Sequence, residues 1–333
     1  MVINTLFPWF ASLNRDWDSN WDKKVKSKVY LLGNGWLARG FMDHIHPKKF
    51  NIINIYNNEI TNTPLLFSDN VPTITFPNYT TNIMETIKSI DIDYSAIITD
   101  KQCFKYTDKD FVVCGLGDNV PISSWQYRWS DVQKAKNIAI VGSGNTGTSL
   151  AFKLNDMSKK VTVYEGLKDS HTYLPDRLKK YVINKMMVNN IGLITDTMYD
   201  KKYDSKYDNV TFAIGSRSND LVSDYLQNET LSLQHNNVSY PNIFLGGNCV
   251  RQTKVLNVDG TNTVMGPNAQ VAYDQGKHIA QTLNRGHTTV YKSKNFVHTL
   301  YVGNNLSALY MNNYNGYLLV PQSLVKLYLT ITK

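Results

Sequence analysis

The chain has 333 residues, of which 42% are hydrophobic and 12% are aromatic. This length accommodates two domains of ordinary size, and the composition excludes a disordered or low-complexity protein. The net charge is +8, but the 35 basic residues form neither a stripe nor a known nucleic-acid-binding motif, so we expect no nucleic-acid partner. The three cysteines form no CxxC pair and no Cys/His cluster, which argues against a disulfide scaffold, a metal site and a dithiol redox centre.

Residues 1–27 are predicted to form an N-terminal extension. Its start is apolar and aromatic, with Trp9 and Phe10, but no basic segment precedes these residues, which disfavours a secretory signal peptide. We expect the extension to pack on the body of the protein, with contact to a membrane interface as the alternative. No apolar run in the sequence reaches the ~18 residues that a membrane-spanning helix needs.

The first predicted unit consists of a strand, a glycine-rich turn, a helix and a second strand. Residues 28–32 form a short apolar run, glycines follow, and a helical pattern continues to about Ile45. Residues 50–56 alternate in polarity and are rich in β-branched side chains, which indicates a strand. This order of elements is typical of a βαβ unit and predicts a parallel sheet.

The same order of elements recurs about 110 residues further along the chain. Residues 137–154 indicate a strand, a glycine turn and a helix, and residues 160–165 indicate the strand that follows. Two such units predict an α/β fold with two Rossmann-like dinucleotide-binding domains.

Further strands and one long helix are predicted outside these two units. Strands that end in glycine are expected at 110–117, 209–215 and 242–248, and a helix at 268–284. Weakly alternating segments at 296–301, 306–311 and 317–320 indicate a small C-terminal cap. The predicted division of the chain is therefore the extension 1–27, the first dinucleotide-binding domain in two parts, 28–132 and 238–290, the second domain 133–237, and the cap 291–333.

The first glycine turn has the residue types that a dinucleotide pyrophosphate requires. Gly33, Gly35 and Ala38 fit the pattern G-x-G-x-x-G/A directly after a strand. The first glycine permits the tight turn, the second lets a phosphate approach the backbone, and the small third residue lets helix and strand pack closely. The next strand ends without a carboxylate, so Asn57 or its neighbour Asn58 is left to bond a ribose.

The second glycine turn is a complete copy of the pattern, formed by Gly142, Gly144 and Gly147. Glu165 ends the next strand, where a carboxylate accepts hydrogen bonds from a ribose and repels a 2′-phosphate. We therefore expect NADH rather than NADPH as the donor. Gly117 and Gly215, which end two further strands, are also counted as cofactor-binding positions.

Two dinucleotide sites in one chain suggest one flavin and one nicotinamide cofactor. A hydride then passes directly between stacked rings, so this step needs no acid or base from the protein. The protein contributes position and electrostatics.

These segments together resemble the FAD- and NAD(P)H-binding pyridine nucleotide oxidoreductases, and among them best resemble a shortened, divergent type II NADH dehydrogenase of the mitochondrial kind. The resemblance spans about residues 28–310. It is carried by residues 32–36, 46–52, 63–66, 140–147, 242–249 and 269–276, the last of which is similar to the family's AQxAxQxG signature.

The resemblance implies FAD in the first domain, NADH in the second, and a quinone or another small electron acceptor near the catalytic candidates Gln270 and Gln275. It also implies a protein on a membrane surface, the mitochondrial inner membrane if the chain behaves like the family and otherwise an intracellular soluble location. A homodimer or a larger assembly is an expected partner state. The further cofactor contacts that it implies are Thr63 and Pro64 beside the flavin, Gly247 and Asn248 at the ribityl chain, and Ala269 in the signature.

The sequence also departs from the family's pattern. Asn248 stands where the family has aspartate, Ser149 stands where it has glutamate, the usual helical connection between Gly117 and Asn137 is missing, and the C-terminal membrane helices are reduced to 317–333 at most. Two readings remain open. The chain is either a flavoprotein that passes electrons from NADH through FAD to a quinone or another acceptor, or a catalytically inactive structural subunit of a larger assembly. A soluble ferredoxin-type reductase shares the cofactors but not the acceptor, and disulfide reduction is disfavoured because no paired cysteine follows the first unit.

Overall fold

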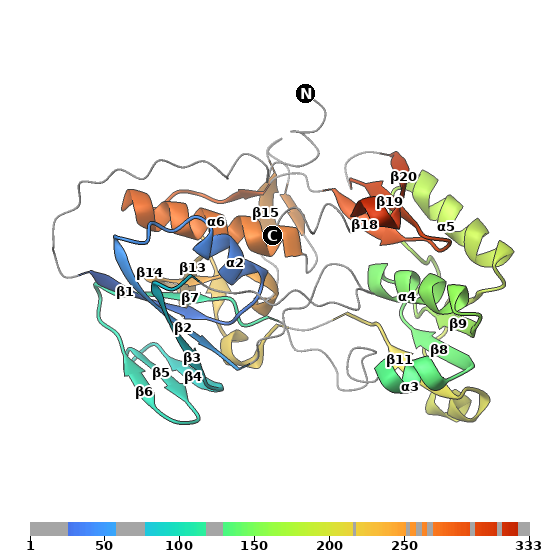
Figure 1. The fold of residues 1–333 in the computed structure, drawn as a ribbon, viewed down its shortest axis with the longest axis horizontal. Coiled ribbons are helices and arrows are strands. Elements are labelled where there is room, and N and C mark those ends of the chain that lie inside the picture. The colour runs from blue at the N-terminus through green and yellow to red at the C-terminus, as the bar shows by residue number, and fades with distance from the viewer. Residues whose placement is uncertain are drawn as a thin grey trace.

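The chain forms a mixed α/β structure with two lobes (Figure 1). The computed structural model describes residues 26–57, 77–117, 129–215, 218–250, 254–257, 262–264, 269–293, 297–311 and 315–325. Residues 1–25, Asn58, Thr63 and Pro64 lie outside the described residues. The larger lobe, on the left of Figure 1, is built on a seven-stranded sheet, and the smaller lobe on a four-stranded sheet. The predicted fold class is confirmed.

The seven-stranded sheet is parallel at its centre and antiparallel at one edge. Its order is β12-β13-β14-β7-β1-β2-β3. The parallel strands are β1 (Ser27–Leu32), β2 (Phe50–Tyr56), β3 (Thr80–Met84), β7 (Phe111–Cys114) and β14 (Val238–Leu245). The antiparallel edge is formed by β12 (Leu226–Gln227) and β13 (Ser232–His235).

The edge strands β12 and β13 return to this sheet earlier in the chain than predicted. They precede residue 238, in the range expected for the second dinucleotide-binding domain, yet β13 pairs with β14 of the first sheet. β13 and β14 are consecutive strands of a hairpin, and β14 joins this hairpin to the sheet by pairing with β7, more than a hundred residues earlier in the sequence. The other predicted domain boundaries stay a prediction.

Strand β1 is buried on both faces, as is usual at the centre of a parallel sheet. Val29 and Leu31 belong to the core under α2 (Trp36–Met42) and α6 (Ala269–Arg285). Tyr30 and Leu32 belong to the core on the opposite face, together with Ile97. That face is covered by an antiparallel sheet of β4 (Ile87–Asp91), β5 (Ala96–Thr99) and β6 (Cys103–Lys105).

Helices α2 and α6 cross so closely that two glycines are required at the contact. A Cβ at Gly40 would lie 2.0 Å from the carbonyl oxygen of Tyr273, and one at Gly276 would lie 2.0 Å from that of Leu37. Helix α2 ends at Met42, three residues before the predicted Ile45, whereas α6 agrees with the prediction within one residue at each end.

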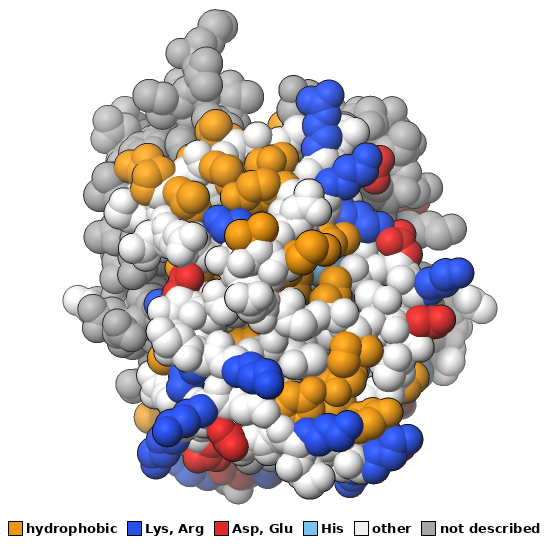
Figure 2. All heavy atoms as spheres, turned by 90° about the vertical axis from the view of Figure 1, so that its right-hand side faces the viewer, with side chains coloured by type: hydrophobic (Ala, Val, Ile, Leu, Met, Phe, Trp, Pro, Cys, Tyr) orange, Lys and Arg blue, Asp and Glu red, His pale blue; other side chains and the backbone are white. Residues whose placement is uncertain are grey.

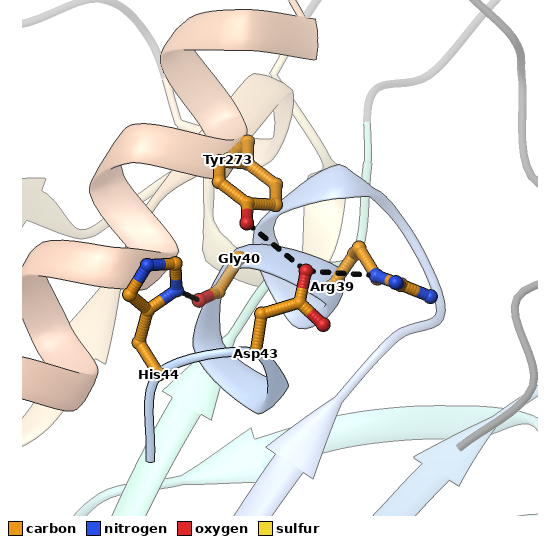
Figure 3. Close-up of polar contacts among 5 residues, drawn as sticks. All are labelled: Arg39, Gly40, Asp43, His44 and Tyr273. Atoms are coloured by element: carbon orange, nitrogen blue, oxygen red, sulfur yellow. Dashed lines mark hydrogen bonds and ion pairs between the residues drawn. The ribbon is translucent and has the colours of Figure 1, made fainter. Parts of the chain in front are cut away.

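Polar side chains close the same crossing at its rim (Figure 3). The hydroxyl of Tyr273 donates to Asp43 Oδ2 at 3.0 Å, and Arg39 Nε donates to the same oxygen at 2.9 Å. His44 Nδ1 lies 3.0 Å from the carbonyl oxygen of Gly40. The bond from Tyr273 ties the end of α2 to α6, and the other two contacts stabilise the last turn of α2.

The four-stranded sheet of the smaller lobe is entirely parallel. Its order is β10 (Gly192–Ile194), β9 (Lys160–Tyr164), β8 (Asn137–Val141) and β11 (Asn209–Phe212). Helices α4 (Asn145–Asp156) and α5 (Asp176–Val188) pack on it through Phe152 and Leu178. The predicted absence of a helix between Gly117 and Asn137 is wrong for the described part of that connection. A six-residue helix, α3 (Trp129–Lys134), lies there, because burial of its Val132 in the same core stabilises it.

The three weakly alternating C-terminal segments form a β-rich cap. Strands β18 (His298–Tyr301), β19 (Leu306–Tyr310) and β20 (Tyr317–Pro321) form an antiparallel sheet. Leu300 and Ala308 belong to the core that α4 and α5 also form, so the cap is packed on the smaller lobe.

The remaining short elements connect these layers. They are the strands β15 (Lys254–Asn257), β16 (Asn262–Val264) and β17 (Lys292–Ser293), and the 3₁₀ helices η3 (Lys201–Lys206), η4 (Asp220–Val222) and η5 (Gly247–Cys249).

The outer face of the smaller lobe mixes hydrophobic and charged side chains (Figure 2). Lysine and arginine are spread among acidic and uncharged residues on this face and form no continuous stripe. Met187 and Val188 at the end of α5 and Leu318 in β20 are exposed. No helix within the described ranges is long and apolar enough to cross a bilayer.

Replacing Gly276 by alanine is expected to destabilise the protein by more than about 2 kcal/mol, because the added Cβ overlaps backbone atoms that cannot move alone. Alanine is otherwise the better helix former by about 1 kcal/mol, so the expected sign opposes helix propensity. Urea unfolding measures the difference. The control is Gln281→Ala, at a half-buried position of the same helix. An unchanged or raised stability for Gly276→Ala contradicts the close crossing.

Candidate functional site

The first glycine turn is held in a conformation that only glycine adopts easily. Gly33 has φ +103°, and a Cβ there would lie 2.3 Å from the carbonyl oxygen of Gly115. The amide of Gly33 donates to the carbonyl oxygen of Ile55 at 2.8 Å, which joins the turn after β1 to the end of β2. Ala38 is completely buried, so the small third residue of the pattern lies in the helix–strand contact, as predicted.

The helix after this turn begins without a capping side chain. Gly35 is the N-cap residue of α2, and it has no side chain that could cap the first turn of the helix. Backbone amides at the start of a helix are donors for an anionic group, which fits a pyrophosphate. The sequence analysis did not identify Asn54, which supports the turn. It is buried, and with its amide oriented to match its neighbours it donates to the carbonyl oxygens of Leu31 and Gly33, at 3.0 Å each.

A second glycine-containing segment, residues 246–249, lies against the same turn. The amide of Gly246 donates to the carbonyl oxygen of Cys114 at 3.1 Å, and the side chain of Leu37 contacts both Gly115 and Gly246. Gly247 has φ +68°. The structure therefore brings the predicted positions Gly33 and Gly247 together around the start of α2.

Helix α6 fixes this second segment through Gln275. The side-chain oxygen Oε1 of Gln275 accepts a hydrogen bond from the amide of Gly247 at 2.7 Å, and Gln275 is only 5% exposed. Gln275 thus has a structural partner in the segment predicted to contact FAD. Its role in catalysis, like that of the half-buried Gln270 in the first turn of α6, stays a prediction.

The other residues predicted around the first site lie at the ends of strands or helices. Asn57 is exposed just beyond β2, and Gly117, with φ +75°, follows β7 in open space. Asn248 is half-buried in η5, and Ala269 opens α6. Their contacts with a cofactor stay predictions.

The second glycine turn repeats the geometry of the first. Gly142 has φ +106°, and a Cβ there would lie 2.6 Å from the carbonyl oxygen of Ala213. A Cβ at Gly147 would lie 2.0 Å from the carbonyl oxygen of Gly142, whereas Gly144 faces open space. Gly144 is the N-cap residue of the twelve-residue helix α4, again without a side-chain cap. The start of α4 therefore presents its first backbone amides beside the open side of Gly144, which suits a pyrophosphate.

Glu165 lies directly after β9 and is bound to the second glycine turn. Its Oε2 accepts hydrogen bonds from the amide of Ser143 at 3.0 Å and from the hydroxyl of Ser143 at 2.6 Å. Its Oε1 accepts from the amide of Leu167 at 3.0 Å. Burial raises the pKa of Glu165, but the hydrogen bonds from Ser143 and Leu167 outweigh burial and lower the pKa below its usual value. The carboxylate is therefore ionised at neutral pH.

An apolar surface lies next to this carboxylate. The amides of Asp196 and Thr197 donate to the carbonyl oxygens of Leu167 and Glu165, which brings Met198 over the chain after β9. A Cβ at Gly166 would lie 2.7 Å from the sulfur of Met198, and the Met198 side chain is 82% exposed. An apolar edge beside an ionised carboxylate suits a planar base next to a ribose. Gly215, with φ +84°, ends the strand segment after β11, and its contact with a cofactor stays a prediction.

Three positions singled out in the sequence are buried in the packing of the fold. Ser149 is buried, and its hydroxyl accepts a hydrogen bond from the amide of Tyr301 at 3.2 Å, so it joins α4 to the cap. Cys114 and Cys249 are buried free thiols, and burial followed by the charge of Cys249 raises the pKa of Cys114. A raised pKa keeps the thiol protonated and weakly nucleophilic. Among the residues that the structure describes, no group of three or more potential ligands could hold a metal ion.

A buried polar cluster lies beneath the second turn and was missed in the sequence. His171 is 2% exposed, and its Nε2 lies 3.0 Å from the hydroxyl of Thr148 in α4. Its Nδ1 lies 2.9 Å from the hydroxyl of Ser170. No motif marks His171, which has φ +58° in the loop between β9 and α5. Burial lowers the pKa of His171 to about 4, although the charge of Glu165 acts in the opposite direction.

Three comparisons with known proteins bear on these sites. Residues 97–276 match the profile of the pyridine nucleotide-disulphide oxidoreductase family. None of the curated proteins matches the chain. Solved structures with a similar fold do exist, at sequence identities that show likeness of fold alone.

The water-forming NADH oxidase from Lactobacillus brevis, bound to NADH, has a TM-score of 0.69 and 17% identity, over 86% of this chain and 75% of that chain. NDH2 from Plasmodium falciparum in complex with NADH has a TM-score of 0.73 and 13% identity, over 93% of this chain and 95% of that chain. A ferredoxin reductase from Rhodopseudomonas palustris has a TM-score of 0.66 and 16% identity, over 86% and 83%.

Lowering the pH is expected to destabilise the protein through His171. The unfolded chain binds a proton at this residue below pH ~6.5, whereas the folded protein binds it only near pH 4, so stability is lost as the pH falls between these values. The contribution is at most about 3 kcal/mol. Urea unfolding at several pH values measures it, with His171→Gln as the comparison, because glutamine cannot be protonated. Equal pH dependence in both proteins contradicts the buried neutral imidazole.

Proposed function

The chain belongs to the pyridine nucleotide-disulphide oxidoreductase family, whose profile matches residues 97–276, and on this premise we propose that it is a flavoprotein that passes electrons from NADH through FAD to a quinone. The coarser statement, an NAD(P)H-linked oxidoreductase of this fold, follows from the family. The donor, the acceptor and the residues that serve them are the proposal.

The observation that carries the proposal is the repetition of one geometry in two glycine turns. Gly33 and Gly142 have φ of +103° and +106°, and both lie against a carbonyl oxygen in the segment after a neighbouring parallel strand. In both turns the N-cap residue of the following helix is a glycine without a side-chain cap. A chain that builds this arrangement twice is suited to hold two dinucleotides.

The residues at the first turn fit FAD. Gly33 permits the tight turn against Gly115, Gly35 leaves the backbone open to the pyrophosphate, and the segment at Gly247, fixed by Gln275, supplies a polar backbone beside it. Asn248 would accept a hydrogen bond from the ribityl chain through a neutral amide, where a carboxylate would make a stronger, charge-assisted bond. FAD, when bound, supplies the acceptor for the two electrons of the hydride.

The residues at the second turn fit NADH. Gly144 and the first amides of α4 would hold the pyrophosphate, and Glu165, already oriented by Ser143 and Leu167, would accept hydrogen bonds from the ribose hydroxyls. Met198 and Leu167 would contact the adenine, since both are exposed apolar side chains next to this carboxylate. The chain's contribution to hydride transfer is therefore to bind and orient the donor.

The acceptor is proposed to be a quinone near Gln270, in the segment 269–276 that resembles the signature of type II NADH dehydrogenases. The likeness in fold to NDH2 supports this choice, but likeness to an NADH oxidase and to a ferredoxin reductase is of similar quality. A quinone acceptor requires a membrane surface, which for the family is the mitochondrial inner membrane. Residues 1–27 are proposed to make this contact.

A second candidate function is a structural subunit that retains the fold. Two observations favour it. Asn248 replaces a charged ligand of the flavin, and Ser149, where the family has a glutamate, is buried and bound to the cap. Flavin content separates the two candidates, because a structural subunit has no need to bind FAD.

The donor preference is expected to depend on the charge of Glu165. Glu165→Gln keeps an oxygen that accepts from Ser143 but removes the negative charge, so the preference for NADH over NADPH should fall at least about tenfold. Reduction of the bound flavin by each donor under anaerobic conditions measures the ratio. Asp169→Asn, a nearby exposed charge removal, is the control and should leave the ratio unchanged. A ratio that does not change in Glu165→Gln shows that the carboxylate does not meet the ribose.

The rates of reaction with different acceptors, measured one at a time, are expected to identify the acceptor. With NADH in excess, a short-chain quinone should be reduced at least about tenfold faster than molecular oxygen or ferredoxin, because the acceptor pocket would be built for a planar ring. The measurement is NADH consumption with each acceptor separately. Fast reaction with oxygen and none with quinone identifies an oxidase instead and overturns the quinone proposal.

A further inference from the structure

The buried polar cluster beneath the second glycine turn forms one continuous chain of hydrogen bonds. Ser170 contacts His171 Nδ1 at 2.9 Å, His171 Nε2 contacts the Thr148 hydroxyl at 3.0 Å, and Thr148 contacts the carbonyl oxygen of Ser143 at 3.0 Å. Ser143 in turn donates twice to Glu165. These hydrogen bonds therefore connect the loop before α5 to the carboxylate of Glu165, which is proposed to bind the ribose.

The number of available protons fixes the direction of these bonds. The carbonyl oxygen of Ser143 only accepts, so the single hydroxyl proton of Thr148 is committed to it. Thr148 must then accept from His171, which places the imidazole proton on Nε2 and leaves Nδ1 to accept from the Ser170 hydroxyl. Tyr173, whose hydroxyl lies 3.4 Å from that of Thr148, is left as a second donor to the same oxygen.

Because these hydrogen-bonded side chains are buried, removing any one of them costs stability. Ser143, Thr148, Ser170 and His171 are all less than 5% exposed. A buried hydroxyl or imidazole that loses its partner retains the cost of its desolvation, so the bonds hold each other in place. The groups that face His171 from its surroundings include Glu165, Lys179, Asp169 and Tyr173, and burial keeps the imidazole neutral among them.

Ser143 links these hydrogen bonds to the middle of the second glycine turn. Ser143 stands between Gly142 and Gly144, and neither glycine has a side chain that could fix the conformation of the turn. A Cβ at Gly144 would meet nothing within 4 Å, so the outer side of the turn is open. The polar contacts that secure the middle of the turn come from Thr148 below it and from Glu165 beside it.

We propose that His171 is a positioning residue for the second glycine turn, which through Thr148 and Ser143 fixes the turn in the conformation that binds the pyrophosphate and ribose of a dinucleotide. This inference rests on the proposed function, because the occupant of the turn is taken to be NADH. His171 itself touches neither the dinucleotide nor the reacting atoms. Its effect is on affinity for the donor and leaves the hydride-transfer step unchanged.

Binding of ADP-ribose to the flavin-loaded protein tests the proposal without turnover. ADP-ribose carries the pyrophosphate, ribose and adenine but no nicotinamide, so calorimetric titration reports binding at the second glycine turn and Glu165 without contacts to the flavin. His171→Leu removes the donor at Nε2 and is expected to weaken binding about tenfold. His171→Gln, whose amide nitrogen can donate to Thr148, is expected to restore affinity to within about threefold of the wild type.

A second matched pair of variants, at Thr148, tests the same series of hydrogen bonds. Thr148→Val removes the hydroxyl at nearly constant volume and is expected to weaken ADP-ribose binding about tenfold, whereas Thr148→Ser keeps the hydroxyl and the affinity. With NADH as donor, KM should rise in parallel while kcat stays unchanged. Should His171→Leu fail to fold, as thermal unfolding and flavin content would show, the Thr148 pair decides the question.

The outcomes separate this proposal from the proposed function. If the wild type binds ADP-ribose and is reduced by NADH, but His171→Leu and Thr148→Val bind equally tightly, the positioning role is overturned and the function stands. Equal losses in the leucine and glutamine variants also overturn it, since they would show a packing effect. If the wild type binds neither ADP-ribose nor NADH, the proposed function fails and this inference fails with it.

Discussion

The close crossing of α2 and α6 is the constraint on which the first site depends. Helix α2 follows the first glycine turn with no intervening residue beyond Gly35, so its position sets the position of the turn. Gly40 and Gly276 allow the two backbones to meet, and Asp43 joins Tyr273 and Arg39 at the rim (Figure 3). Helix α6 also holds the segment at Gly247 through Gln275. One helix, more than two hundred residues away in sequence, thus organises both parts of the first site.

The second site uses a different device for the same purpose. Its turn repeats the backbone geometry of the first, but the support comes from below, through Thr148 and His171, and from the side, through Glu165. The cap is fixed to the same helix, since Ser149 of α4 accepts from Tyr301. Both faces of α4 are therefore committed: one supports the turn, and the other carries the cap.

Much of the fold was predictable because its signals are local. The strand, glycine turn and helix of each unit depend on residues within about twenty positions, and the three cap strands were found from alternation alone. The antiparallel sheet of β4, β5 and β6 was not predicted, since its strands have only three to five residues and are partly exposed. The antiparallel edge of β12 and β13 beside β14 was also missed, because these two strands have only two and four residues.

The candidate sites show the same division. The glycines of both turns and Glu165 follow from a pattern, because backbone geometry demands those residue types at that spacing. The bond from Gly247 to Gln275 and the bond from His171 to Thr148 each connect residues more than twenty positions apart, and His171 has a left-handed backbone in a loop without a motif. Such contacts exist only once the tertiary structure has formed.

Anaerobic titration of the purified, FAD-reconstituted protein with NADH tests the central claim most directly. The account predicts that FAD remains bound through gel filtration and that its visible absorption band is bleached by an equimolar amount of NADH, since both transfer two electrons. A protein that retains no flavin after reconstitution, or a bound flavin whose spectrum NADH leaves unchanged, would contradict the claim that these two glycine turns hold an electron donor and its acceptor.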